Sequence, residues 1–196
     1  MKAQKLRNCL RSNTLMRIAG AHDAVTAIIA ERLGFECIWS GGLGISAVNG
    51  VPDASILTLT ELLAATRVLV NATTIPVIAD CDSGFGDVNI INRVVREYEA
   101  IGVAGICIED KQFPKRNSFF GKQKLADAFD FAGKLAAAKR AQRNVDFVLV
   151  ARTEALVAGR CMDEAIRRSK LYVAAGADAI LVHSKAAHAH EVLEFA

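Results

Sequence analysis

Short apolar runs alternate with longer amphipathic stretches along the whole chain. The short runs predict buried strands, and the amphipathic stretches predict helices because their apolar residues recur with the period of a helix. Between Val88 and Ile101, for example, Ile91, Val94 and Val95 fall on one side of a helix. The predicted strands are Leu15–Ala19, Cys37–Ser40, Val77–Asp80, Gly105–Glu109, Phe147–Ala151 and Ala179–His183. The predicted helices are Asp23–Leu33, Thr60–Val70, Val88–Ile101, Lys124–Arg143, Met162–Ala175 and His188–Phe195.

Three of the predicted helices end in a glycine that precedes the next strand: Gly34, Gly102 and Gly176. Glycine adopts the left-handed conformation that ends many helices, so we expect a C-cap at each position. Repeated units of helix, glycine and strand are typical of a parallel β-sheet. Six such units fit a doubly wound open sheet, whereas a (β/α)8 barrel takes about 250 residues and eight units. The turn after the first strand lacks the GxGxxG spacing, which argues against dinucleotide binding.

The 196 residues are 52% hydrophobic and 23% charged, which is typical of a globular protein with a large core. The net charge of +3 comes from scattered side chains, so no basic face indicates a nucleic-acid partner. The chain shows no signal-peptide pattern and no apolar run near the roughly 20 residues of a membrane span. Its five cysteines are dispersed without a CxxC spacing, as in reduced cytosolic proteins. We therefore expect one domain over residues 1–196, located in the cytoplasm, without a nucleic-acid or membrane partner.

Acidic residues follow two strands that we expect to be neighbours. Asp80 and Asp82 come at the end of the third strand, and Glu109 ends the fourth. Neighbouring strands lie about 4.8 Å apart, and residues two positions apart in a strand project to the same side. The three carboxylates should therefore converge. Such a set suits a hard, oxygen-loving cation, with Mg²⁺ as the first choice; the alternative is that the acids cap helices or pair with lysines.

Other strand ends carry groups suited to an anionic small molecule. Arg152 follows an apolar strand, so it should face either a substrate anion or a nearby carboxylate such as Glu154. Gly41 and Gly42 either let a ligand approach backbone amides closely or form a plain βα turn. His183 closes the last strand, where a functional and a structural role are both open.

Taken together, these motifs resemble the phosphoenolpyruvate mutase/isocitrate lyase superfamily, and within it the phosphoenolpyruvate mutase family. The resemblance runs from about residue 5 to the end of the chain, and it is specific because the order and spacing of the motifs match together. The motifs are Trp39-Ser40-Gly41-Gly42-Leu43, Asp53, Asp80-Cys81-Asp82-Ser83-Gly84-Phe85-Gly86, Glu109-Asp110-Lys111, Lys115-Arg116-Asn117-Ser118, Arg152 and His183-Ser184-Lys185. The resemblance implies an isomerase that interconverts phosphoenolpyruvate and phosphonopyruvate, forming the carbon–phosphorus bond of phosphonates.

The same resemblance implies a (β/α)8 TIM barrel with its site at the carboxyl ends of the strands, in place of a doubly wound sheet. On that fold the chain is truncated after its sixth βα unit. We expect two further strands with their helices, about 80 to 90 residues on the typical length of the barrel, beyond Ala196. Family members exchange a last helix between subunits, so the resemblance also implies a homo-oligomer, either a dimer or a tetramer.

The resemblance assigns a role to each candidate residue. The Mg²⁺ ligands are Asp80, Asp82 and Glu109. The substrate-binding residues are Trp39, Gly41, Gly42, Leu43 and Ser118, with the amides of Gly42 and Leu43 facing the pyruvyl group. The catalytic residues are Asp53, Lys115, Asn117, Arg152 and His183. Of these, Asn117, Arg152 and His183 surround the phosphoryl group, Lys115 neutralises charge and helps close the loop, and Asp53 has an electrostatic or metal-water role.

The loop over residues 110–125 is expected to act as a lid that excludes water, and its sequence separates the subfamilies. Carbon–carbon lyases of the superfamily carry a cysteine in a Lys-Arg-Cys-Gly pattern, where this chain has Lys115-Arg116-Asn117-Ser118. An amide cannot exchange a proton as a thiol does, but it can donate hydrogen bonds to phosphoryl oxygens. Phosphonopyruvate hydrolases tend to have a threonine in place of Asn117, so the asparagine favours the mutase.

Three alternatives to the mutase stay open: a phosphonopyruvate hydrolase, a carbon–carbon lyase of the same superfamily, and a truncated remnant without catalysis. The chain also departs from the family at one point. Mutases read Gly-Ser-Gly-Leu after the tryptophan, whereas this chain reads Ser40-Gly41-Gly42-Leu43. The amides of Gly42 and Leu43 remain available for a carboxylate, but the contact of a serine at position 41 is lost.

Overall fold

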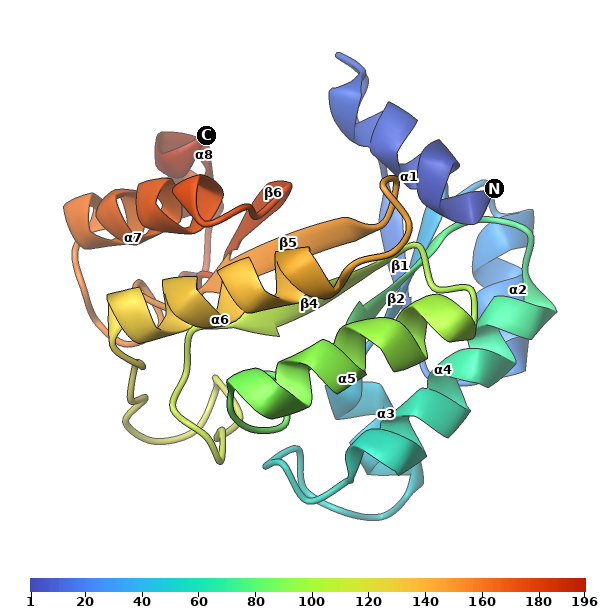
Figure 1. The fold of residues 1–196 in the computed structure, drawn as a ribbon, viewed down its shortest axis with the longest axis horizontal. Coiled ribbons are helices and arrows are strands. Elements are labelled where there is room, and N and C mark those ends of the chain that lie inside the picture. The colour runs from blue at the N-terminus through green and yellow to red at the C-terminus, as the bar shows by residue number, and fades with distance from the viewer.

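The protein folds around one curved sheet of six parallel strands, as a computed structural model of residues 1–196 shows (Figure 1). The strands are β1 (Ile18–Ala21), β2 (Cys37–Ser40), β3 (Val77–Asp80), β4 (Gly105–Glu109), β5 (Val148–Thr153) and β6 (Ala179–Val182). The helices are α1 (Lys2–Arg11), α2 (Ala24–Arg32), α3 (Gly42–Val48), α4 (Leu59–Ala72), α5 (Val88–Ala100), α6 (Ala128–Ala141), α7 (Met162–Ala174) and α8 (His190–Phe195). None of these helices is both long and apolar enough to cross a membrane.

The strands follow one another in the sheet in the order of the sequence, and every pair is parallel. At least one helix lies between each pair of consecutive strands in the chain, as parallel pairing requires. Figure 1 shows the helices α2, α4, α5 and α6 arranged along the outer side of the sheet. The expected architecture is confirmed as six consecutive units of a (β/α) barrel.

The core has two layers, one on each face of the sheet. The larger layer packs strand residues such as Ile106 and Leu149 against the helices outside. The smaller layer lies on the inner face, where Leu6 of α1 packs against Ile78 and Val148. Side chains of α1 also donate hydrogen bonds to backbone carbonyls and so hold the helix against the sheet. The Lys2 ammonium, for example, donates to the carbonyls of Val70 and Thr73, both at 2.6 Å. Helix α1 therefore covers the end of the sheet opposite the carboxyl ends of the strands.

The glycine pattern was a reliable signal of the helix ends. Gly34, Gly102 and Gly176 follow α2, α5 and α7 with φ of 81°, 83° and 106°, so the predicted left-handed positions are confirmed. In each case the amide of the glycine donates to a carbonyl of the preceding turn. These three caps fix the point at which the chain leaves the outer layer and returns to the sheet.

The starts of two predicted elements were wrong by three residues or more, and local hydrogen bonds explain both. The first strand begins at Ile18, not at Leu15, which is 89% exposed, because the sheet register starts where Ile18 meets Cys37. Helix α6 begins at Ala128, not at Lys124. Its N-cap is Asp127, whose carboxylate accepts from the amides of Phe129 and Asp130. The backbone before Asp127 is extended and pairs with residues 110–112 instead.

Two helices were not predicted at all. Helix α1 is strongly polar, and only Ala3 and Leu6 in it are buried. Helix α3 begins at Gly42, in a stretch that suggested a turn because it is rich in glycine. Both are short elements whose positions depend on contacts with distant parts of the chain, which a periodic pattern does not reveal.

Candidate active site

A cavity of about 270 Å³ lies at the carboxyl ends of the strands. Its walls include every predicted site residue except Asp82 and Glu109, together with Phe119. These residues come from six places along the chain: the end of β2 with the start of α3, the loop before α4, the end of β3, the lid, the end of β5 and the end of β6. The structure therefore brings together residues that are separated by up to 144 positions in the sequence, from Trp39 to His183.

The first turn of α3 supplies backbone donors at one wall of this cavity. Gly41 is the N-cap, and the helix begins at Gly42. The first amides of an α-helix have no acceptor within the helix, so those of Gly42 and Leu43 are available to an anionic ligand. At Gly41, a Cβ would lie 3.3 Å from the ring of Trp39, so the missing side chain leaves room beside the tryptophan.

The lid, residues 110–125 between β4 and α6, contributes Lys115, Asn117, Ser118 and Phe119 to the wall of the cavity. It is anchored to the loop between α3 and α4. The backbone amide of Lys115 donates to Ser55 Oγ at 3.1 Å, and Asn117 Nδ2 donates to Asp53 Oδ2 at 3.1 Å. These contacts place the side chains of Lys115 and Asn117 in the wall of the cavity.

Lys115 is buried among carboxylates. Its ammonium lies 2.7 Å from Asp53 Oδ1 and 2.7 Å from Asp82 Oδ1, and all three side chains are less than 10% exposed. Burial lowers the pKa of Lys115, but Asp82, Asp80, Glu109 and Asp53 outweigh it and raise that pKa above its ordinary value. The ammonium is therefore charged at any physiological pH and serves as the counter-charge of this acidic cluster.

The acids of the cluster differ from ordinary surface carboxylates. Burial raises the pKa of Asp82 to about 6, with further contributions from Asp80 and Asp53, although Lys115 opposes the shift. Burial likewise raises the pKa of Glu109 to about 7, although Arg152 opposes it. The ion pair with Lys115 by itself would lower the pKa of Asp82. Burial and the neighbouring carboxylates raise this pKa by more than Lys115 lowers it.

The residues present fit a divalent cation. A Cβ built on Gly42 would lie 3.3 Å from Asp82 Oδ1, 3.7 Å from Asp53 Oδ1 and 3.9 Å from Asp80 Oδ2, so three carboxylates face one point. Two buried oxygens, Asp82 Oδ1 and Glu109 Oε1, accept no hydrogen bond. Asp82 Oδ1 is close to the Lys115 ammonium, but the angle is not that of a hydrogen bond. Carboxylate oxygens that accept no hydrogen bond are available as ligands of the kind that Mg²⁺ prefers.

The expected convergence of Asp80, Asp82 and Glu109 takes a different form from the one predicted. No set of three acidic, histidine or cysteine side chains is arranged as a ready metal site. Strand β3 ends at Asp80, and Asp82 has a left-handed backbone with φ of 50°, so the two acids are not neighbours on one face of a strand. The Glu109 carboxylate lies between Lys111, at 3.6 Å, and Arg152, at 3.5 Å.

Arg152 and His183 form the basic wall of the cavity together with a carboxylate. The Nε of Arg152 pairs with Glu154 Oε1, and one of its terminal nitrogens lies 2.6 Å from His183 Nδ1. The same Nδ1 lies 2.8 Å from Glu154 Oε1. Burial opposes ionisation of Glu154, but the hydrogen bond from His183 and the charge of Arg152 outweigh it and lower its pKa to about 2. Arg152 therefore pairs with Glu154, the expected nearby carboxylate, and it also lines the cavity.

Sequence reasoning missed the role of Lys111, which is 3% exposed. Its ammonium donates to Ser118 Oγ at 2.5 Å and to the Arg116 carbonyl at 3.0 Å, and it lies 3.4 Å from Glu154. Ser118 in turn donates to Glu154 Oε2 at 3.0 Å. Lys111 thus ties the end of β4 to the far side of the lid. Its signal in the sequence was a lysine directly after a buried strand and two acids.

Asp110 was also missed, and it lies outside the cavity. Its carboxylate accepts from Tyr172 Oη at 2.6 Å, from an Arg168 nitrogen at 3.1 Å and from the Glu154 amide at 2.8 Å. All of these atoms are buried. Asp110 therefore holds the end of β5 against α7, and it fixes the backbone from which Glu154 reaches the site.

The comparison with known proteins assigns the chain to a family. A sequence model described as phosphoenolpyruvate phosphomutase matches residues 6–196. The chain belongs to the phosphoenolpyruvate phosphomutase family. It is 42% identical to a phosphoenolpyruvate phosphomutase from Tetrahymena pyriformis over 196 residues, which are 99% of this chain and 65% of that protein. The chain thus spans about two thirds of the length of this relative.

Solved structures of the family agree with this assignment. A phosphoenolpyruvate phosphomutase from Streptomyces platensis subsp. rosaceus is 51% identical with a TM-score of 0.97, covering all of this chain and 68% of that one. A phosphonopyruvate hydrolase in complex with oxalate and Mg²⁺ is 43% identical with a TM-score of 0.93, covering all of this chain and 67% of that one. Relatives named as lyases match as well, at 40% and 36% identity. The relatives of this family member are enzymes of several reaction types.

Proposed function

We propose that the protein is a phosphoenolpyruvate mutase, which interconverts phosphoenolpyruvate and phosphonopyruvate. The observation that carries this proposal is the position of Asn117. Its side chain lies in the lid and donates to Asp53, in the wall of the same cavity that Arg152 and His183 line. An amide in this place can donate to a phosphoryl oxygen, but it cannot exchange a proton as a carbon–carbon lyase requires. The identity of 51% to a mutase structure supports the same conclusion.

The residues around the cavity suit the movement of a phosphoryl group within one substrate molecule. The amides of Gly42 and Leu43 would bind the pyruvyl end of the substrate. Arg152, His183 and Asn117 would surround the phosphoryl group while it passes between the enol oxygen and C3. Because this group resembles metaphosphate in the transition state, positioned positive charge and hydrogen-bond donors supply most of the stabilisation.

Asp80, Asp82 and Glu109 are the residues that would hold Mg²⁺, and buried oxygens of Asp82 and Glu109 that accept no hydrogen bond support this choice. Bound there, the ion supplies positive charge that stabilises negative charge developing on the substrate oxygens. The Lys115 ammonium balances the same carboxylates from the lid. The similarity to a hydrolase structure that contains Mg²⁺ supports this choice of cation.

The nearest alternative is a phosphonopyruvate hydrolase with the same fold and the same cavity. The two differ in whether water reaches the transferring group, so the lid has to exclude water in a mutase. Incubation with phosphonopyruvate and Mg²⁺, followed by ³¹P NMR, separates them. A mutase gives phosphoenolpyruvate, a hydrolase gives inorganic phosphate, and a non-catalytic protein leaves the substrate unchanged.

A further inference from the structure

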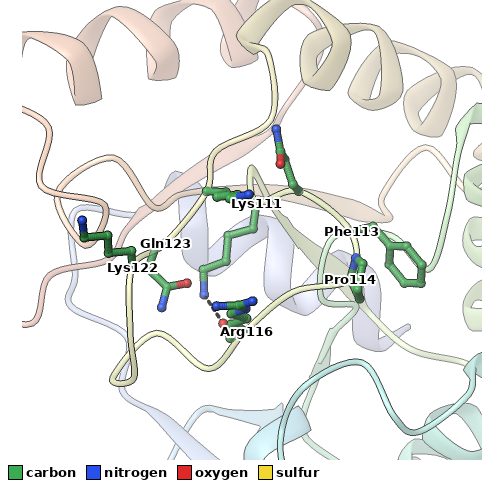
Figure 2. Close-up of a pocket in the computed structure, with 8 residues that line it drawn as sticks. Lys111, Phe113, Pro114, Arg116, Lys122 and Gln123 are labelled. Carbon is green, nitrogen blue, oxygen red and sulfur yellow. Dashed lines mark hydrogen bonds between the residues drawn. The ribbon is translucent and has the colours of Figure 1, made fainter.

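A second cavity, of about 260 Å³, lies between the two arms of the lid. Its walls come entirely from residues 111–124, and it shares no residue with the cavity described above. Figure 2 shows the Lys111 side chain running through it toward Arg116, with Lys122 and Gln123 on the other arm. We refer to this space as the lid cavity.

The lid cavity is lined by positive charge without a balancing acid. Four of its eight lining residues are cationic, namely Lys111, Arg116, Lys122 and Lys124, and none is acidic. Lys111 is paired with Glu109 and Glu154 on its inner side. The side chains of the other three make no ion pair and no hydrogen bond. All three are exposed, and they lie within one short segment of the chain. Like charges gathered in a concave space raise the local potential and attract an anion.

The backbone of the lid holds this arrangement in place. Lys111 and Leu125 form an antiparallel bridge, and the Gln112 amide donates to the Lys124 carbonyl at 3.0 Å. Across the lid, Gln123 Nε2 donates to the carbonyls of Asn117 and Phe120, both at 2.9 Å. The two arms are therefore tied at their base and near their tip, so the cations come from a folded segment rather than from a free tail.

We propose that the lid cavity binds a phosphoryl dianion, at a site separate from the catalytic cavity. A guanidinium and two ammonium groups match the charge of a dianion better than that of a single carboxylate, and arginine pairs with phosphoryl oxygens through two hydrogen bonds. A ligand held by Arg116 on one arm and by Lys122 and Lys124 on the other would link the arms. Because Lys115 and Asn117 flank Arg116 in the chain, the ligand would also restrain these two residues, which line the catalytic cavity. This binding proposal holds whether the protein is a mutase, a hydrolase or a lyase.

The test is a titration with inorganic phosphate, followed through the backbone amide signals of Gln112, Lys122, Gln123 and Lys124 by NMR. Mg²⁺ is left out, and sodium chloride keeps the ionic strength constant. We expect these signals to shift in a saturable way with phosphate and not with chloride. Following individual amides separates this site from any phosphate bound near Arg152.

The variant for this test is Lys122→Gln/Lys124→Gln, and Lys5→Gln/Lys170→Gln is its matched control. All four lysines are exposed, so each double change removes the same charge from the surface. We expect at least tenfold weaker phosphate binding at the lid amides in the first variant and less than a twofold change in the second. Lid amides that do not respond to phosphate, or that respond equally to chloride, would overturn the proposal. So would equal weakening in the two variants.

Discussion

The charge balance around Lys115 can be tested by replacing this residue with methionine. The change keeps most of the volume of the side chain and removes its charge. The carboxylates of Asp53 and Asp82, each 2.7 Å from the ammonium, would then lose their partner in a site where all three side chains are less than 10% exposed. We expect the variant to be less stable than the wild type in the presence of a chelator.

The size of the effect follows from the burial of the cluster. Removing one partner of a buried ion pair costs about 3–5 kcal/mol of unfolding free energy. We expect the lower end, about 3 kcal/mol, because Asp82 already has a pKa raised to about 6 and can take up a proton when Lys115 is gone. For a chain of this size that loss lowers Tm by about 6–12 °C.

The pH dependence of this loss has a definite sign. Without Lys115 the pKa of Asp82 in the folded state rises further above its value in the unfolded state. Such a group destabilises the folded state at high pH, and the loss shrinks as the pH falls through the raised pKa. The deficit of the variant is therefore expected to be larger at pH 8 than at pH 5.5. Added Mg²⁺ should raise the Tm of the variant more than that of the wild type, because a cation replaces the missing charge.

Thermal unfolding followed by circular dichroism measures these differences. Lys139→Met is the matched control, because it removes the same kind of side chain from a pair with Asp178 in which Lys139 is 34% exposed. Pairs of that kind contribute about 0.2–1 kcal/mol. A Lys115→Met variant as stable as the wild type, or one that loses no more stability than Lys139→Met, would show that Lys115 does not balance the buried carboxylates.

Three further predictions concern other parts of the molecule. Asn117→Ala should remove about 2–4 kcal/mol of transition-state stabilisation and so lower kcat/KM for phosphonopyruvate. An unchanged kcat/KM in steady-state kinetics would remove Asn117 from the mechanism. Burial opposes a low pKa at Asp178, but hydrogen bonds from Lys139 and the Leu149 amide outweigh it and lower the pKa below 3.8. The stabilisation from Asp178 should therefore be complete above pH 5 and disappear as the pH falls below 3.8, so urea unfolding of wild type and Asp178→Asn should converge only in acid. Gly105→Ala should destabilise the sheet by more than about 2 kcal/mol, because the new Cβ would lie 2.5 Å from the Val148 carbonyl oxygen; urea unfolding with an unchanged midpoint would contradict this.

The sequence predicted all six strands, although not every boundary, and most residues of the cavity. The apolar runs that became β2, β3 and β4 have the predicted bounds, because each is buried on both faces and reads as a continuous run. The carboxyl ends of parallel strands meet at one edge of a sheet, so residues as distant as Trp39 and His183 could be placed in one site. The family resemblance then added the residues from loops, such as Asp53 and Asn117.

What the sequence could not predict depends on contacts between distant segments. Two hydrogen bonds fix the position of the lid: Lys115 donates to Ser55, 60 positions away, and Asn117 donates to Asp53, 64 positions away. No local pattern shows that Lys115 neutralises Asp82, or that Lys111 ties the lid to Glu154. The start of α6 was misplaced for the same reason, since residues 124–126 pair with residues 110–112 rather than continue the helix.

The central claim is that the phosphoryl group returns to the same substrate molecule and is not lost to water. The most direct test is the ratio of products in the first turnovers with phosphonopyruvate and Mg²⁺, recorded by ³¹P NMR with a chelator-treated sample as the control. For a mutase we expect a phosphoenolpyruvate signal that grows from the start, with inorganic phosphate a minor product, and no reaction in the control. Inorganic phosphate as the main initial product would refute the mutase assignment and identify a hydrolase.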